Sequence, residues 1–274
     1  MGREEFFSPS IDDGCLPYCY ACHVQSFSFL HRAVVATTRT FMRLLPVRIT
    51  PSAWGKPALY PVVFEGEEFL VRKYMPDRAV LREVWEKRCY PAPQDGDIVM
   101  DIGANIGAYA VFASRAAKHV YAFEPEASNF EQLSQNIRHK KNITALRLAV
   151  AGSAGTRMLG TPRMSRNRSS LYDQSKGQEV HCVTLREAIG RTGASVIDLA
   201  KVDIEGAEYE TLLHTTPEIL RRCRSIFLEF HDGWTSHTYP ELTAHLTQAG
   251  FSVRLRRGLQ YWTQGTGYIE ATRN

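Results

Sequence analysis

The chain has 274 residues, of which 44% are hydrophobic and 23% charged, and its formal net charge is +4. This hydrophobic content is enough to form a packed core, which excludes an intrinsically disordered chain. The 19 glycines and 13 prolines are scattered, which excludes a collagen-like or low-complexity protein. A charge this small does not indicate nucleic-acid binding, and we expect no nucleic-acid partner.

The sequence contains no clear targeting signal. No run of about 18 uncharged apolar residues is present, so we expect no transmembrane segment. The first residues, MGREEFFSPS, are acidic where a secretory signal would be basic and then apolar. The predicted location is therefore the cytoplasm.

Residues 1–50 form a predicted appendage, with a polar tail over 1–25 and a helix over 26–46. Phe27 and Leu30 fall on one face of this helix and Arg32 on another, which predicts packing on the protein body. Weak contact with a membrane surface is the alternative.

Three cysteines, Cys15, Cys19 and Cys22, lie in the polar tail. Their CxxxCxxC spacing is typical of iron–sulfur radical enzymes, and Cys19 to His23 fits the CxxCH haem pattern. Haem attachment needs export and a radical enzyme needs a following barrel, and the sequence indicates neither. We therefore expect no cofactor at these cysteines.

Residues 51–94 form a second predicted segment that leads into the main domain. Two alternating apolar runs within 60–73 flank Glu65-Gly66-Glu67, which predicts a β-hairpin. Asp77 is placed to cap a helix that continues to about Tyr90.

Residues 95–274 alternate between strand and helix patterns, which predicts a mostly parallel sheet with crossover helices. A polar insertion over 152–178 interrupts this alternation. Strands are expected at 98–103, 120–125, 143–150, 179–184, 199–206, 225–231 and 251–257, and helices at 108–118, 128–140, 185–193, 207–220 and 239–249.

The loop after the first of these strands carries Asp101, Gly103, Asn105 and Gly107. Ligands of such sheets bind beyond the carboxyl ends of the strands, and glycines there allow a tight turn and close backbone approach. Asn105 replaces the middle glycine of a dinucleotide fingerprint, so a pyrophosphate fits poorly. Asp101 would repel phosphates and suits a cationic ligand.

Glu124 ends the second strand about 20 residues after Gly103, the spacing at which a carboxylate accepts hydrogen bonds from ribose hydroxyls. The alternative is an acid that starts a helix before Pro125. With the glycine loop, Glu124 indicates a positively charged nucleoside, a description that fits S-adenosylmethionine.

The segments VMDIGANIGAYA, VYAFEPEASNFEQLSQNI, LAKVDIEGAEYETLL and IFLEFH together resemble the FkbM-type family of S-adenosylmethionine-dependent methyltransferases. The resemblance implies an α/β class I methyltransferase (Rossmann-like) fold, mostly parallel and seven-stranded with its last strand antiparallel. The helix and hairpin predicted above form an N-terminal extension of this fold. It implies O-methylation of a hydroxyl on a small-molecule natural product or carbohydrate. It places the loop residues and Glu124 on the cofactor, Asp203, Glu205 and Gly206 on an AspxGluGly motif, and Tyr90 in the lead-in segment.

Two later strands are expected to end facing the transferred methyl. Side chains alternate along a strand, so Glu229 and His231 point the same way, as do Lys201 and Asp203. Because an alcohol must lose its proton, we hypothesise that His231 is the general base, oriented by Asp203 or Glu229. The alternative is a structural histidine.

A divalent cation held by Asp203, Glu229 and His231 is a second hypothesis, and this ligand set suits Mn²⁺ or Zn²⁺ better than Mg²⁺. We do not favour it. Glu205 and Trp234 are candidate contacts to the small-molecule or sugar acceptor, although Glu205 would also suit a helix cap. Further candidates are Tyr239, Trp262 and, in the insertion, Arg157, Arg163, Arg166, Arg168, Ser169 and Ser170.

Two other functions compete with methyl transfer. An NAD-dependent oxidoreductase uses a related sheet, although Asn105 argues against it. A non-catalytic cofactor-binding protein is the other, although the intact Glu124 and Asp203 argue against that. The acceptor, the methylated atom and the oligomeric state stay open.

Overall fold

The computed structural model describes residues 58–160, 177–258, 261 and 264–273. These residues belong to one unit of the chain, which begins at Ala58. The predicted helix at 26–46 and the cysteines of the polar tail lie outside the described residues.

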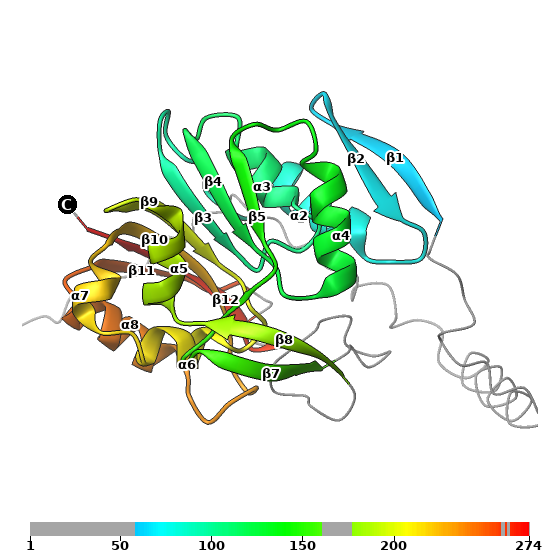
Figure 1. The fold of residues 1–274 in the computed structure, drawn as a ribbon. Helices are drawn as coiled ribbons and strands as arrows, with labels where there is room; N and C mark the ends of the chain where they lie inside the picture. The colour runs from blue at the N-terminus through cyan, green and yellow to red at the C-terminus, as the bar shows by residue number, and fades with distance from the viewer. Residues whose placement is uncertain (1–57, 161–176, 259–260, 262–263, 274) are drawn as a thin grey trace, which may run out of the picture. The chain divides into compact units, whose positions relative to one another are not determined.

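A seven-stranded sheet runs through the centre of this unit (Figure 1). The only antiparallel pairings in it are those of the strand Thr266–Thr272 with its two neighbours. This arrangement confirms the sheet that the family resemblance implies. In order across the sheet, the strands are β11 (Ser252–Arg256), β12 (Thr266–Thr272), β10 (Cys223–His231), β9 (Ile197–Val202), β3 (Ile98–Ile102), β4 (His119–Phe123) and β5 (Ile143–Leu146).

The predicted hairpin and helix extension precede this sheet. Strands β1 (Leu59–Phe64) and β2 (Glu67–Arg72) pair antiparallel around a two-residue turn. Glu65 and Gly66 both have positive φ, 47° and 84°, as such a hairpin turn requires. The helix that follows, α2 (Asp77–Trp85), is shorter than predicted.

Asp77 does not cap α2, contrary to the prediction. Its carboxylate instead accepts hydrogen bonds from the backbone N–H and the guanidinium of Arg72, and both side chains are buried. A buried arginine requires a buried anion, and this pairing takes the carboxylate away from the helix terminus.

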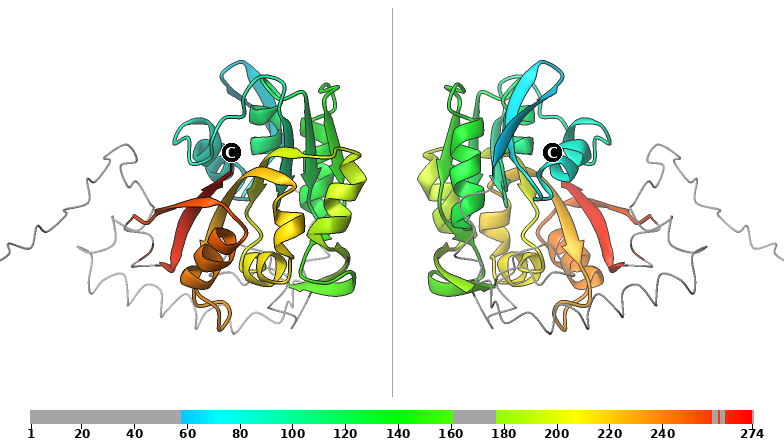
Figure 2. Two further views of the ribbon diagram at one scale, coloured as in Figure 1. Left: turned by 90° about the vertical axis from the view of Figure 1, so that its left-hand side faces the viewer. Right: turned by 90° about the vertical axis from the view of Figure 1, so that its right-hand side faces the viewer.

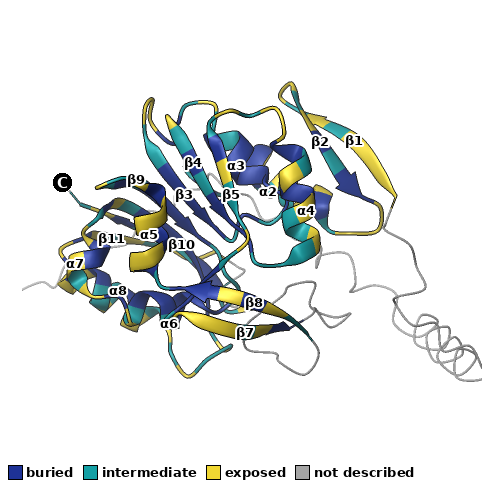
Figure 3. Ribbon diagram, viewed as in Figure 1, coloured by how far each residue is buried: buried dark blue, intermediate teal, exposed yellow. Residues whose placement is uncertain are grey.

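Helices cover both faces of the sheet, as Figures 1 and 2 show. Val99 packs with α2–α4, whereas its neighbour Met100 packs on the other face with α5–α8, because strand side chains alternate. The central strands are buried on both faces along most of their length (Figure 3), and most of their residues are apolar. None of the described helices has the length and hydrophobicity needed to cross a bilayer. The helices after α2 are α3 (Ala108–Ala113), α4 (Ala127–Asn136), α5 (Leu185–Thr192), α6 (Glu208–Leu213), α7 (Pro217–Leu220) and α8 (Tyr239–Gln248).

A small second sheet replaces the single strand predicted over 143–150. The chain leaves the main sheet after β5, and β6 (Ala149–Val150) pairs with β8 (Gly177–Val183), which pairs in turn with β7 (Gly155–Gly160). Part of the predicted polar insertion is therefore strand. The candidate residues Arg163, Arg166, Arg168, Ser169 and Ser170 lie outside the described residues.

Candidate active site

A cavity of about 380 Å³ opens where β3, β4 and β9 end, within the usual range for small-molecule sites. The lead-in segment closes one side of it with Arg72, residues of α2, and Tyr90. Six of the predicted site residues line the cavity: Gly103, Asn105, Glu124, Asp203, Glu205 and Glu229.

The glycines of the loop after β3 are fixed by close packing. Gly103 has φ +83°, and a Cβ there would lie 1.8 Å from the carbonyl oxygen of Asp203. Gly107 has φ +86°, and its Cβ would lie 2.7 Å from Leu133 of α4. Gly107 therefore allows close packing of the loop against α4, and it does not line the cavity.

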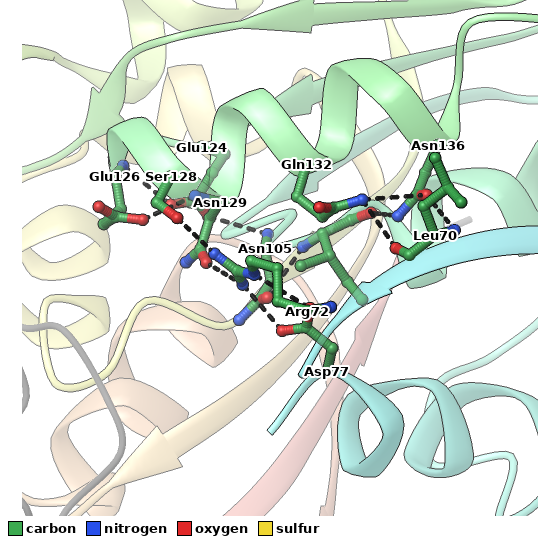
Figure 4. A network of polar contacts seen from close by, with 11 residues as sticks. Leu70, Arg72, Asp77, Asn105, Glu124, Glu126, Ser128, Asn129, Gln132 and Asn136 are labelled. Atoms are coloured by element: carbon green, nitrogen blue, oxygen red, sulfur yellow. Dashed lines mark hydrogen bonds and ion pairs between the residues drawn. The ribbon is translucent and has the colours of Figure 1, made fainter. Parts of the chain in front are cut away.

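Glu124 points its carboxylate at the loop and is 5% exposed. It accepts hydrogen bonds from the backbone N–H groups of Asn105 (2.8 Å) and Glu126 (2.9 Å), as Figure 4 shows. A carboxylate offers about four lone-pair sites, so acceptor capacity remains for a ligand hydroxyl. Burial raises the pKa of Glu124 to about 7.

Asp101 occupies a different place from the one predicted. It is 0% exposed and does not line the cavity. It lies opposite Lys201 in the β3–β9 register, with Nζ of the lysine 3.1 Å from its Oδ1. Burial raises the pKa of Asp101, and Lys201 opposes that rise. The negative charge predicted to meet a cationic ligand is therefore matched by a cation of the protein itself.

Tyr90 connects the lead-in segment to the carboxylates at the ends of β9 and β10. Its hydroxyl lies 2.8 Å from Asp203 Oδ2 and 3.2 Å from Glu229 Oε2. Burial and these two carboxylates raise the pKa of Tyr90 well above its usual value, so the hydroxyl stays protonated. The sequence placed Tyr90 only within the lead-in segment, because no local pattern indicates so distant a contact.

His231 lies between carboxylates at the end of β10 and is 1% exposed. Its Nδ1 is 3.0 Å from Glu208, whereas its Nε2 is 3.3 Å from Glu205 and 4.0 Å from Glu229. Burial opposes a charge on the ring, but these carboxylates outweigh it and raise the pKa of His231 to about 10. A ring protonated at neutral pH has no lone pair for a proton, which opposes the predicted general-base role.

Glu208 is the orienting group for His231, where the sequence predicted Asp203 or Glu229. It is completely buried and also accepts hydrogen bonds from the backbone N–H groups of Ile204 (3.0 Å) and Gly206 (2.8 Å). The backbone-capping role that the sequence allowed for Glu205 thus belongs to Glu208. The acid is visible in the sequence DIEGAE, but nothing there indicates which of its two glutamates turns inward.

One group of side chains in the described part of the chain has the composition of a metal site. Asp203, Glu205 and His231 each offer one ligand atom, and these atoms lie within 4.8 Å of one another. The group differs from the predicted set because Glu205 takes the place of Glu229.

The two predicted aromatic contacts that the structure describes, Trp234 and Tyr239, do not line the cavity. Trp234 packs edge-on against His231 with ring centroids 6.1 Å apart. Tyr239 packs against Phe230 in the core, at 5.2 Å between centroids. Trp262 lies outside the described residues.

Arg157, the one described arginine of the predicted insertion's candidate set, is also bound within the protein. On β7, its Nη1 lies 2.5 Å from Glu210 Oε1, and its Nη2 donates to Ser153. Its charge is matched by a carboxylate of α6.

A buried network attaches the lead-in segment to α4 beside Glu124 (Figure 4). Arg72 donates to Asp77 through Nε and Nη2, to Ser128 through Nη1, and to Asn129 through Nη2. Asn136 accepts from the backbone N–H of Leu70 (2.9 Å). These contacts fix the wall of the cavity that β2 and α2 supply.

The sheet order and the position of this cavity define a class I methyltransferase fold. The family model described as the methyltransferase FkbM domain matches residues 101–253, more than half of the chain. The chain therefore belongs to the FkbM methyltransferase family and is a methyltransferase.

Two curated relatives show how far this similarity extends. The 31-O-demethyl-FK506 methyltransferase FkbM of Streptomyces tacrolimicus is 28% identical over 221 residues, covering 68% of this chain and 82% of the relative. The hexuronic acid methyltransferase AglP of Haloferax volcanii is 25% identical over 204 residues, covering 74% and 81%.

Solved structures with similarity to the chain include two methyltransferases. A methyltransferase FkbM from Methylobacillus flagellatus has a TM-score of 0.49 and 13% identity, with coverage of 70% of this chain and 47% of that one. A Streptococcus mutans methyltransferase in complex with SAH has a TM-score of 0.46 and 14% identity, with coverage of 73% and 98%.

Proposed function

We propose that the chain transfers the methyl group of S-adenosylmethionine to a hydroxyl oxygen of a small-molecule natural product or carbohydrate. The observation that carries this proposal is that Glu124 and the loop at Gly103 line the same cavity at the end of β3. The name of one relative, 31-O-demethyl-FK506 methyltransferase, supports an oxygen acceptor on a small molecule, and the name of the other, hexuronic acid methyltransferase, supports a carbohydrate acceptor. The predicted cytoplasmic location is part of the proposal.

The residues present fit this cofactor. Gly103 lets the loop lie against the backbone of Asp203 at the edge of the cavity, and Glu124 retains acceptor capacity for the two ribose hydroxyls. Asp203, Glu205 and Glu229 line the same cavity and suit a positively charged ligand. When bound, the cofactor supplies a methyl group on a positively charged sulfur, which leaves as a neutral thioether.

The acceptor hydroxyl must lose its proton as its oxygen forms the bond to the methyl carbon. Glu205 lines the cavity and its side chain is 20% exposed, whereas His231 does not line it. We therefore assign the role of general base to Glu205, whose carboxylate accepts the proton of the acceptor hydroxyl. His231, which is held by Glu208, positions that carboxylate. Asp203 and Glu229, both hydrogen-bonded by Tyr90, complete the acceptor side.

We propose that the reaction does not require a divalent cation. Nε2 of His231 is the atom that would ligate a metal, because Glu208 engages Nδ1, and the carboxylate of Glu205 already lies 3.3 Å from this nitrogen. Dialysis against a chelator should leave methyl transfer unchanged, and loss of activity restored by Mn²⁺ would contradict this.

The test of the function is incubation with methyl-labelled S-adenosylmethionine and a host metabolite extract, followed by mass spectrometry of labelled products. We expect a labelled methyl ether, and less of it with Glu124→Gln when S-adenosylmethionine is limiting. Binding of NAD in place of S-adenosylhomocysteine would favour the oxidoreductase alternative. Binding of S-adenosylhomocysteine with no labelled product from any extract would favour a non-catalytic protein.

A further inference from the structure

Two cationic side chains line the cavity among the residues that the structure describes, Arg72 and Lys201. The guanidinium of Arg72 is held by Asp77, Ser128 and Asn129, next to Glu124 (Figure 4). Asp77 balances the charge of Arg72. This pair lies at the first turn of α4, on the side of the cavity that holds Glu124. Lys201 lies on β9, which is separated from β4 by β3.

The ammonium group of Lys201 is fixed at the edge of the glycine loop. The side chain is 4% exposed, and Nζ donates to the carbonyl oxygen of Gly103 at 2.8 Å. Asp101 lies 3.1 Å away, and Asp203 Oδ2 lies 3.9 Å away, beyond hydrogen-bond distance. The ring of Tyr90 lies 5.2 Å from the same nitrogen. Because Lys201 lines the cavity, its ammonium group is the cation that an acceptor at this end of the cavity would meet.

The rest of this end of the cavity is negatively charged. The carboxylates at this end would repel the carboxylate of a ligand unless that ligand paired with a cation, because like charges close together in a buried site are strongly unfavourable. Burial opposes the charge of Lys201, but Asp101 and Asp203 outweigh it and raise its pKa, so the cation persists at neutral pH. The carboxylates that act on it are Asp101, Asp203 and Glu229.

We propose that Lys201 binds the carboxylate of the amino-acid end of S-adenosylmethionine and thereby sets the direction of the cofactor across the end of β3. This rests on the proposed function. Glu124 at the end of β4 takes the ribose, so the amino-acid end extends toward β9, where Lys201 is the cation available to meet a carboxylate. The surrounding acids suit the ammonium group of the same amino acid.

The test uses two ligands that differ only in this carboxylate, S-adenosylhomocysteine and its decarboxylated analogue, which keeps the ammonium. Isothermal titration calorimetry gives both affinities for the natural protein and for Lys201→Met. A charge-assisted hydrogen bond corresponds to about a tenfold to hundredfold difference in affinity. We expect the natural protein to prefer S-adenosylhomocysteine by about that factor, and Lys201→Met to lose the preference while it binds the analogue as well as before.

Two further variants control for folding and for charge. Lys201→Met leaves Asp101 buried without its cation, so the double variant Asp101→Asn with Lys201→Met removes both charges, and circular dichroism and thermal melts check each protein. Lys118→Met removes a lysine that is exposed and outside the cavity, and it should retain the full preference.

Three outcomes separate the inference from the proposed function. Equal weakening of both ligands by Lys201→Met would make Lys201 a purely structural residue and overturn the inference. A preference for the carboxylate that survives in both Lys201 variants would also overturn it. A natural protein that binds neither ligand would contradict the proposed function itself, and the inference with it.

Discussion

The hydroxyl of Tyr90 lies 2.8 Å from Asp203 Oδ2, although the two residues are 113 positions apart in the chain. Tyr90 follows the lead-in helix, and Asp203 follows β9 in the central sheet. The same hydroxyl reaches Glu229 at 3.2 Å. The site is thus incomplete without the lead-in segment, because this segment provides the donor that holds two of the acceptor-side carboxylates.

Replacing Tyr90 with Phe should lower the free energy of unfolding by about 1.5–3 kcal/mol, the range for a hydrogen bond to a charged group. Tyr109→Phe is the matched control, because its equally buried hydroxyl donates to a neutral backbone carbonyl, that of Pro91. That change should cost about 0.5–1.5 kcal/mol. Urea unfolding measures both, and equal losses would show that the carboxylates do not strengthen the Tyr90 bond.

Local signals were enough to predict part of this site. The turn after β3 and the acid at the end of β4 are set by neighbouring residues, and Gly103, Asn105 and Glu124, which were predicted as cofactor contacts, line the cavity. The partner of Asp101 depends on the register between β3 and β9, and one strand does not reveal its register with another. The sequence therefore assigned to a ligand a charge that Lys201 neutralises.

Glu124 should make the affinity for S-adenosylhomocysteine depend on pH. Burial raises its pKa from 4.5 to about 7, so its carboxylate becomes ionised only as the pH passes about 7. The ionised form accepts hydrogen bonds from hydroxyls more strongly. Affinity should therefore rise from about pH 6 to about pH 8, and calorimetry across this range measures it.

The same shift in the pKa of Glu124 also lowers the stability of the unliganded protein. The folded protein retains the proton of Glu124 to a higher pH than the unfolded chain, so stability is lost as the pH rises from 4.5 through about 7. Glu124→Gln should bind S-adenosylhomocysteine about tenfold more weakly, with no pH dependence across this range. The exposed Glu218→Gln should keep both the affinity and its pH dependence, and a flat profile in the natural protein would argue against a raised pKa.

His231→Gln should be far more destabilising than His237→Gln. His231 is 1% exposed and pairs with Glu208, which is completely buried. Removing one partner of such a buried pair costs about 3–5 kcal/mol of stability. His237 and Glu241 are 45% and 46% exposed, so that change should cost less than about 1 kcal/mol.

The pH dependence of this difference has a definite sign. The folded pKa of His231 is about 10 and its ordinary value is 6.5, so the stabilisation is complete below 6.5 and is lost as the pH rises through about 10. The free energies of unfolding of the natural protein and of His231→Gln, measured with urea, should therefore become more similar as the pH approaches 10. A neutral His231 ring at about pH 7, seen by nitrogen NMR, would contradict this and restore the general-base role predicted from the sequence.

Two glycines with the same backbone conformation test whether the loop at Gly103 is held closed in solution. Gly103 and Gly96 have φ of +83° and +87°, but a Cβ on Gly103 would lie 1.8 Å from the Asp203 carbonyl oxygen, whereas one on Gly96 would meet nothing within 4 Å. Gly96→Ala should therefore cost about 1–2 kcal/mol, the cost of a left-handed conformation alone. Gly103→Ala should cost more than about 3 kcal/mol, because the ends of β3 and β9 must also separate.

Urea unfolding gives the two costs, and calorimetry should show that Gly96→Ala keeps its affinity for S-adenosylhomocysteine while Gly103→Ala loses it. Equal costs would mean that the close approach of Gly103 to Asp203, on which the shape of the cavity depends, does not persist in solution.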